Sequence, residues 1–287
     1  MPAANLWSDV SSISNSIREN ALFVVREQYQ MQNLVTVRND MGGLNPRVIN
    51  EYNQAAAVVV AESDDLTSSA FTPAVLATLT PAEIGLQFFV TDSRRDSDVP
   101  ENIIRDGAME LGMAAGDKLE SGLVTAMASL TGGTIGTAGT AITWGYLAAA
   151  IAVARNKNKS SGVPLSAVIH GYQWAVLAKS ASIAGAAVGT AAPSYAEQVT
   201  KTGFAGEFMG VPLYVSYSSP DTSDDFTGGV FPKSAIMLDW RRSVTIEPER
   251  DASRRGTEFN MSAVYAAGVM RAKLGVKMIF DATAPTS

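Results

Sequence analysis

The fold is decided by residues 98–130, which read DVPENIIRDGAMELGMAAGDKLESGLVTAMASL. Asp98 stands three residues before Glu101, with Pro100 in the first turn, a spacing typical of a helix start. Apolar residues then recur every three or four positions, at Ile104, Ala108, Leu111, Ala115, Leu119, Leu123, Ala126 and Leu130. Thr131-Gly132-Gly133 follows as a stop. The pattern predicts one helix about 48 Å long, at about 1.5 Å per residue, around which the rest of the chain is organised.

The glycines of this segment give a further expectation. Gly107, Gly112, Gly116 and Gly122 lie inside the predicted helix, where each costs about 1 kcal/mol relative to alanine. We expect other backbone to pack closely against them. An ordinary long bundle helix is the alternative interpretation of the same pattern.

Composition limits the classes of protein. The chain has 287 residues, 46% of them hydrophobic and 17% charged, which indicates a folded protein with a large core in one elaborate domain or two connected ones. It has no cysteine, which excludes disulfides and thiolate metal sites. The net charge of −6 argues against a surface that wraps DNA. Residues 144–154 are continuously apolar but too few to span a bilayer, so no membrane association is expected.

The part before the long helix is predicted to be a helical arm, a hairpin and a strand. Val10, Ile13, Ile17, Ala21 and Val24 keep helical spacing within residues 9–28, and a short strand is expected at residues 34–38. Residues 47–61 and 71–80 are extended-looking arms around an acidic tip at residues 62–69, which predicts a long hairpin. Residues 84–90 alternate as a strand. A two-stranded hairpin is marginal alone in water, so this one must lie on something else.

The part after the long helix is predicted to be an inserted α/β module and closing strands. Helices are expected at 144–155, 171–183 and 195–202, strands at 165–170, 211–217 and 235–239, and loops at 185–193 and 218–232. Residues 244–247 and 270–280 alternate as strands. In the last run one face is apolar and the other carries Arg271, Lys273 and Lys277. We expect the strands before the long helix and at the C-terminal end to pair in one sheet.

Few residues indicate catalysis. His170 is the only histidine and ends an apolar strand, so a structural role is favoured over general-base chemistry. Asp64-Asp65 and Asp224-Asp225 could ligate a metal, but adjacent acids in polar loops are more often solvated tips. Gly132 to Gly136 resembles a phosphate loop only loosely and follows a helix instead of a strand. No cofactor, no metal and no enzymatic activity are therefore expected.

Three arginine doublets form a more informative pattern. Each occurs beside acidic residues in the segments assigned to the sheet, and the doublets are Arg94-Arg95, Arg241-Arg242 and Arg254-Arg255. A solvated charged face is one interpretation. The other is that their guanidinium groups bind carboxylates of a neighbouring subunit, with Asp64 and Asp65 of the hairpin tip facing Arg94-Arg95 or Arg241-Arg242.

The order of these elements resembles the major capsid protein of tailed bacteriophages, the Hong Kong 97-like fold. The resemblance covers nearly the whole chain and is carried mainly by residues 79–92, 206–215 and 265–281. It implies an α+β fold with a long spine helix, an extended hairpin loop, a peripheral antiparallel sheet and an inserted α/β axial domain. The implied segments are an N-terminal arm (1–41), the extended loop (42–80), the peripheral domain with the spine (81–139), the axial domain (140–238) and peripheral strands (239–287).

The resemblance also implies a function. The protein would assemble as pentamers and hexamers into an icosahedral shell around double-stranded DNA, contacted weakly and without sequence specificity. It would be built in the host cytoplasm and found in the virion. Scaffolding is expected as a separate protein or a removed piece, together with portal and decoration proteins. Residues 42–80 contain no lysine, so the lysine-to-asparagine crosslinking of some family members is not supported. An encapsulin-like compartment shell and a soluble α/β enzyme using carboxylates are the alternatives.

Overall fold

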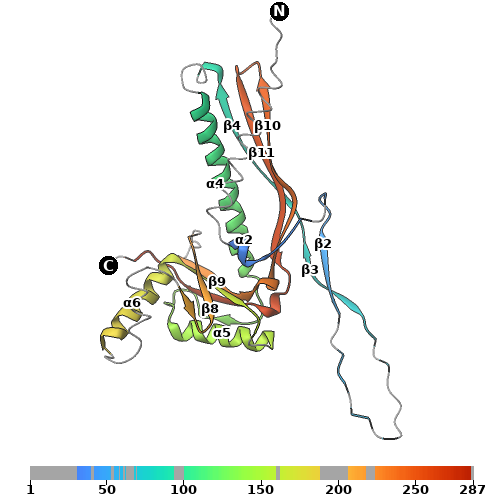
Figure 1. Cartoon of the computed structure of the whole chain (residues 1–287), viewed down its shortest axis with the longest axis vertical. Helices are drawn as coiled ribbons and strands as arrows, with labels where there is room; N and C mark the ends of the chain where they lie inside the picture. Colours follow the sequence, from blue (N-terminus) through green and yellow to red (C-terminus); the bar gives the residue numbers. More distant parts are fainter. Residues whose placement is uncertain are drawn as a thin grey trace, which may run out of the picture.

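The computed structural model describes residues 31–39, 42–52, 55–57, 59, 60, 62, 68, 70–93, 100–159, 162–187, 206–217 and 224–285. Within them, the long helix α4 (Pro100–Met127) runs along a sheet of long strands (Figure 1). A second sheet with its helices lies at the foot of α4, and the hairpin points away from both. This arrangement of spine, sheet, module and projecting arm is the one expected from the sequence.

Helix α4 is the predicted spine. Its 28 residues span roughly 42 Å at 1.5 Å per residue. The predicted apolar stripe is buried at every position where side chains are described, at Leu111, Ala115, Leu119, Leu123, Ala126 and Leu130. The helix ends at Met127, three residues before the predicted end, and the capping residue Asp98 lies outside the described residues. At Gly107 the close neighbour is a side chain and not backbone, because a Cβ there would lie 2.7 Å from the ring of Phe88.

Four strands form the peripheral sheet beside α4. Their order is β1 (Thr36–Arg38), β10 (Ile236–Asp251), β11 (Gly256–Val269) and β4 (Ala82–Thr91). Strand β1 follows the short helix α2 (Met31–Leu34) and pairs with β10 in parallel, whereas the other pairs are antiparallel. Phe88 of β4 stacks on Phe259 of β11 with ring centroids 4.7 Å apart. The predicted strands at 34–38, 84–90 and 244–247 are confirmed in outline, while the predicted helix at 9–28 lies outside the described residues.

The inserted module is built on a six-stranded sheet. Its order is β5 (Thr134–Ile135), β12 (Val276–Asp281), β9 (Asp225–Pro232), β6 (Leu165–His170), β8 (Val211–Ser216) and β7 (Glu207–Phe208). Helices α5 (Trp144–Asn158) and α6 (Gly171–Ala187) accompany it. The Thr143 hydroxyl accepts a hydrogen bond from the Tyr146 N–H at 3.3 Å, which caps α5 as expected for threonine at a helix start. Leu147, Ile151, Ile169, Val230 and Phe280 belong to its core.

Two sequence predictions in the module are wrong. Residues 218–232 were expected to be a loop, but residues 225–232 form β9 in the middle of the sheet, and the 3-10 turn η1 (Lys233–Ala235) leads into β10. Residues 185–187 form the last turn of α6 instead of a loop. The predicted helix at 195–202 lies outside the described residues.

The C-terminal run 270–280 is not one strand. Strand β11 ends at Val269, the 3-10 turn η2 (Ala272–Leu274) follows, and β12 pairs with β9 and β5 in the module's sheet. Strand β4 therefore pairs with β11 and not with the final strand. Met270 packs with the cluster of Leu79, Met237 and Ala266, whereas Met278 belongs to the module's core. One alternating run thus supplies two different cores.

The division of the chain into five segments remains a prediction. It assigns β5 and β12 to the peripheral domain, but both strands pair in the six-stranded sheet of the module.

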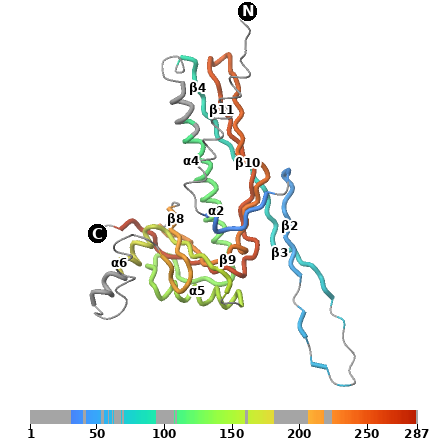
Figure 2. The backbone as a smooth tube through the Cα atoms, in the orientation of Figure 1, coloured from blue at the N-terminus to red at the C-terminus, as the bar shows by residue number. Residues whose placement is uncertain are grey.

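The hairpin consists of β2 (Arg47–Tyr52) and β3 (Pro73–Leu79), paired antiparallel. Figure 2 shows both strands leaving the body of the molecule at the level where the peripheral sheet and the module meet. The hairpin predicted from the sequence is confirmed in its described residues.

Candidate functional site

The hairpin exposes large apolar side chains. Val48 is 53% exposed, Val75 65% and Phe71 66%. Tyr52 and Phe71 stack across the two arms with ring centroids 4.6 Å apart, which stiffens the hairpin beyond its paired strands. Residues 48–93 contain no lysine or arginine. The hairpin is therefore an acidic arm with an apolar surface that its own chain leaves uncovered.

The base of the hairpin is fixed by a buried ionic cluster. Arg47, the first residue of β2, donates from Nε to Oδ2 of Asp239 at 3.0 Å and from Nη2 to Oδ1 at 2.8 Å. The side chain of Asp239 is fully buried, and that of Arg47 is 10% exposed. Such a two-pronged pair sets the direction of the guanidinium as well as its position. The contact ties the arm to β10 of the peripheral sheet.

Arg241 belongs to the same cluster. Its Nη2 lies 2.8 Å from Oδ2 of Asp239, within ion-pair distance, and its side chain is 1% exposed. The guanidinium nitrogens make no well-aligned hydrogen bond within the described residues. The contact with Asp239 is therefore an ion pair, because attraction between charges does not require the alignment that a hydrogen bond does. Arg241, predicted to contact a neighbouring subunit, is turned into its own chain.

The other described arginines of the doublets lie on the surface. Arg242 forms an ion pair with Glu83 of β4 and donates to the Ser262 hydroxyl at 3.2 Å. Arg254 contacts Glu258 at 2.6 Å and covers the ring of Phe89, 4.1 Å from its centroid. Arg255 is exposed in the turn between β10 and β11. Two of these three outward-facing arginines are thus paired with acids of their own chain.

The remaining predicted contact residues, Asp64, Asp65, Arg94 and Arg95, lie outside the described residues. Their roles as inter-subunit contacts remain predictions.

Two of the residues considered for catalysis or metal binding, His170 and Asp225, are buried and hydrogen-bonded within the chain. His170 is 4% exposed, and its Nδ1 accepts from the Tyr172 N–H at 3.2 Å. Asp225 was expected to be a solvated tip, which is wrong: it is 6% exposed, and its Oδ1 accepts from the Gly139 N–H at 2.7 Å. Within the described residues, no three acids, histidines or cysteines gather as metal ligands. In the same part of the chain, no helix is long and apolar enough to cross a membrane.

Glu120 is an ionisable group that the sequence did not single out. It lies on α4, where burial raises the pKa of its carboxyl to about 7; the hydrogen bond from the Met31 backbone opposes this shift, and the nearby charge of Asp117 adds to it. Its Oε2 is buried without a hydrogen-bond partner within the described residues. The carboxyl group therefore couples the contact between α2 and α4 to pH.

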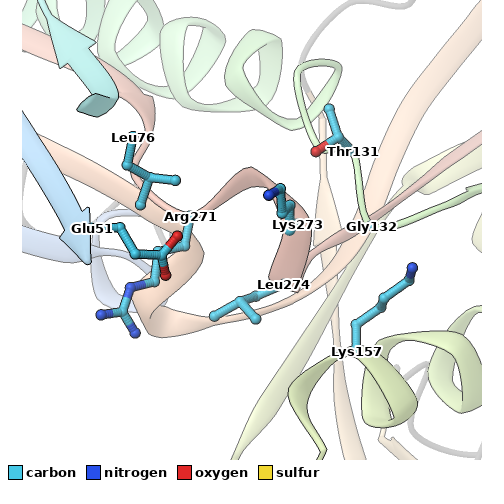
Figure 3. A pocket seen from close by; sticks show the side chains of 8 residues that line it. All are labelled: Glu51, Leu76, Thr131, Gly132, Lys157, Arg271, Lys273 and Leu274. Atoms are coloured by element: carbon cyan, nitrogen blue, oxygen red, sulfur yellow. The ribbon is translucent and has the colours of Figure 1, made fainter. Parts of the chain in front are cut away.

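A basic pocket lies where the hairpin, the end of the spine and the module meet (Figure 3). Its volume is about 310 Å³, and it is lined by Glu51, Leu76, Thr131, Gly132, Lys157, Arg271, Lys273 and Leu274. The sequence had shown Arg271 and Lys273 on one face of a supposed strand. Because that segment is a 3-10 turn, these cations instead line one pocket together with Lys157 of α5.

Comparisons with known proteins agree with this architecture. The family model described as phage capsid protein matches residues 74–278, most of the chain. The chain belongs to the phage capsid protein family. No match is found among curated proteins.

The solved structures similar to this phage capsid protein share its fold at low sequence identity. That of Mycobacterium phage Che8 has 21% identity and a TM-score of 0.65, covering 90% of this chain and 93% of the other. The capsid of cyanophage P-SCSP1u has 16% identity and a TM-score of 0.66, covering 88% of each chain. The virus-like particle from Pyrococcus furiosus has 11% identity and a TM-score of 0.60, covering 92% of this chain and 98% of the other.

These findings establish the protein as a structural capsid protein with the Hong Kong 97-like fold of tailed-phage major capsid proteins. In this fold, α4 is the spine, β2 and β3 form the extended loop, and the six-stranded sheet belongs to the inserted α/β domain.

Proposed function

We propose that this capsid protein assembles with copies of itself, as pentamers and hexamers, into a closed icosahedral shell that encloses double-stranded phage DNA. The observation that carries the proposal is the hairpin. A two-stranded arm is only marginally stable alone in water, yet this one exposes Val48 and Val75 of its strands and Phe71 just before β3. If a neighbouring subunit covers these side chains, the burial would stabilise the assembly by about 25 cal/mol for each square ångström of apolar surface removed from water.

The charge of the chain suits a container. A net charge of −6 opposes tight, sequence-independent binding of phosphates, so the packaged DNA is contacted weakly. The role is structural and needs no catalytic turnover. Scaffolding, portal and decoration proteins are the further partners of such a shell, which would be assembled in the host cytoplasm and end in the virion.

A compartment that holds protein cargo is the second candidate. The likeness to the virus-like particle from Pyrococcus furiosus, which covers nearly all of that chain, supports considering this candidate. The two candidates share the shell and differ in its contents.

The contents decide between them. The protein is expressed in the presence and absence of its neighbouring genes, particles are isolated by sedimentation, and their contents are analysed after nuclease treatment. Shells that protect a DNA of uniform length support the phage head. Shells that hold one protein species and no protected DNA would favour the compartment, and a protein that forms no particles under either condition would contradict both.

A further inference from the structure

The basic pocket is an interaction site that its own chain leaves incomplete. It gathers Lys157 from α5 with Arg271 and Lys273 from the η2 turn, while Glu51 of β2 is its only acid (Figure 3). All three cations are exposed. Within the described residues, none of them lies within 4.0 Å of a carboxylate. The pocket therefore has an excess of positive charge.

The pocket is held rigidly by backbone contacts. The N–H of Thr131 donates to the carbonyl of Ala272 at 2.9 Å, and the N–H of Gly132 donates to that of Gly275 at 2.9 Å. Nδ2 of Asn158, next to Lys157, donates to the Leu274 carbonyl at 3.0 Å. The end of the spine, α5 and the η2 turn are thus tied together. The backbone segments that carry the three cations are therefore fixed relative to one another before any ligand arrives, which reduces the ordering cost of binding.

The hairpin carries the opposite charge. Residues 48–80 contain Glu51, Glu62, Asp64 and Asp65 and no cation. Of the two arginine doublets expected to meet these acids, Arg241 is paired with Asp239 and Arg242 with Glu83, whereas Arg94-Arg95 lies outside the described residues. Lys157, Arg271 and Lys273 are cations that remain unneutralised.

We propose that this pocket receives the acidic segment 62–65 from the hairpin of a second copy of the chain. The inference rests on the proposed self-assembly and names the surface on which one hairpin tip binds. Two lysines and an arginine match three carboxylates in number. The apolar side chains of Leu76 and Leu274 line the same pocket and suit Leu66, which follows the acids directly. A phosphate backbone has no such apolar group, so the lining favours a peptide over DNA.

Zero-length crosslinking tests the contact in the unmodified protein. A carbodiimide joins lysine to carboxylate only when the two groups touch. Shells assembled from equal amounts of unlabelled and isotope-labelled protein should yield mixed-label peptides that join Lys157 or Lys273 to Glu62, Asp64 or Asp65. Unassembled subunits should not yield them. Lys118, an exposed lysine of α4, is the matched control and should remain unlinked to these acids.

Charge reversal tests whether the contact drives assembly. Lys157→Glu with Lys273→Glu should raise the protein concentration needed for shells about tenfold, since a few ion pairs become repulsive. Asp64→Lys with Asp65→Lys in the same chain should restore most of the loss. Lys118→Glu should leave assembly unchanged, and circular dichroism should show that each variant folds.

The outcomes separate this inference from the proposed function. Shells that form normally but give no mixed-label crosslink, together with reversals that have no effect or are not rescued, would overturn the inference and leave the shell intact. Protection of the pocket lysines from acylation only in DNA-filled particles would assign the pocket to phosphates and also overturn it. Failure of the unmodified protein to form particles would instead count against the proposed function.

Discussion

Asp239 in β10 accepts two hydrogen bonds from Arg47, a residue 192 positions earlier at the start of the hairpin, and both side chains are largely buried. This pair is where the extended arm is joined to the peripheral sheet. The direction in which the arm leaves the body, visible in Figure 1, therefore depends on two charged groups and not only on strand pairing.

Arg47→Ala should weaken the base of the hairpin. The substitution removes two charge-assisted hydrogen bonds from buried Asp239, which Arg241 still neutralises in part, so we expect a loss of about 2 kcal/mol. Hydrogen exchange of residues 47–52 and 73–79 should accelerate, and denaturant unfolding should show the loss. Arg242→Ala is the matched control, since its pair with Glu83 is about half exposed and worth less than about 1 kcal/mol. Equal effects of the two substitutions would contradict the role given to Asp239.

Glu120 should make the stability of the subunit fall as pH rises. Its pKa is about 7 in the folded protein against an ordinary value of 4.5, so the folded state binds more protons between these values. The stabilisation is complete below pH 4.5 and is lost as pH rises through 7. Because the carboxyl is only partly buried, the loss is discounted to about 1 kcal/mol.

The substitution Glu120→Gln checks this directly. It should leave the unfolding free energy nearly unchanged at pH 4.5 and raise it at pH 8, where the wild-type carboxyl is charged. Denaturant unfolding at both pH values measures the difference. If the unfolding free energy of the variant differs from that of the wild type by the same amount at both pH values, the carboxyl of Glu120 is solvated and the explanation is wrong.

Gly132→Ala should destabilise the junction beside the basic pocket. A Cβ there would lie 2.6 Å from the Lys273 carbonyl oxygen and 2.5 Å from that of Gly275, which also accepts the Gly132 N–H. We expect a loss of about 2 kcal/mol or more, as for other overpacked sites. Gly145→Ala in α5 is the control. Its nearest neighbour is 3.7 Å away, and alanine favours a helix by up to about 1 kcal/mol. Thermal unfolding of both variants should therefore shift in opposite directions.

Local patterns predicted the elements of this fold well. The apolar spacing of α4, the Thr143 cap of α5 and the apolar run of β6 each depend on neighbours in sequence, and each element is found within three residues of the expected end. The exact pairing of strands depends on contacts between distant residues. The alternating run 270–280 was divided between two sheets because Ala235 accepts the N–H groups of Met270 and Arg271 and turns the chain there.

The site was predicted less completely, for a similar reason. The sequence shows that Arg241 stands beside acids but not that register shifts in β10 accompany its burial against Asp239. Asp225 is buried because the Gly139 N–H, 86 residues away, satisfies its carboxylate. The basic pocket combines cations from α5 and η2, which no local pattern could bring together.

Deleting residues 62–69 should leave a folded subunit that assembles poorly. A loop tip with few local contacts tolerates shortening, whereas a tip that binds a neighbour does not. Circular dichroism should be unchanged while light scattering shows a higher concentration threshold for shells. Equal assembly by the shortened hairpin and the intact protein would count against the arm as an assembly element.

The central claim is that this chain is completed by copies of itself, and cryo-electron microscopy of particles formed by the unmodified protein tests it most directly. The account predicts closed shells with icosahedral symmetry in which β2 and β3 of each subunit lie on a neighbouring subunit. That neighbour covers the side chains of Val48, Val75 and Phe71. A protein that stays monomeric at high concentration, or a shell in which these side chains face only solvent, would contradict it.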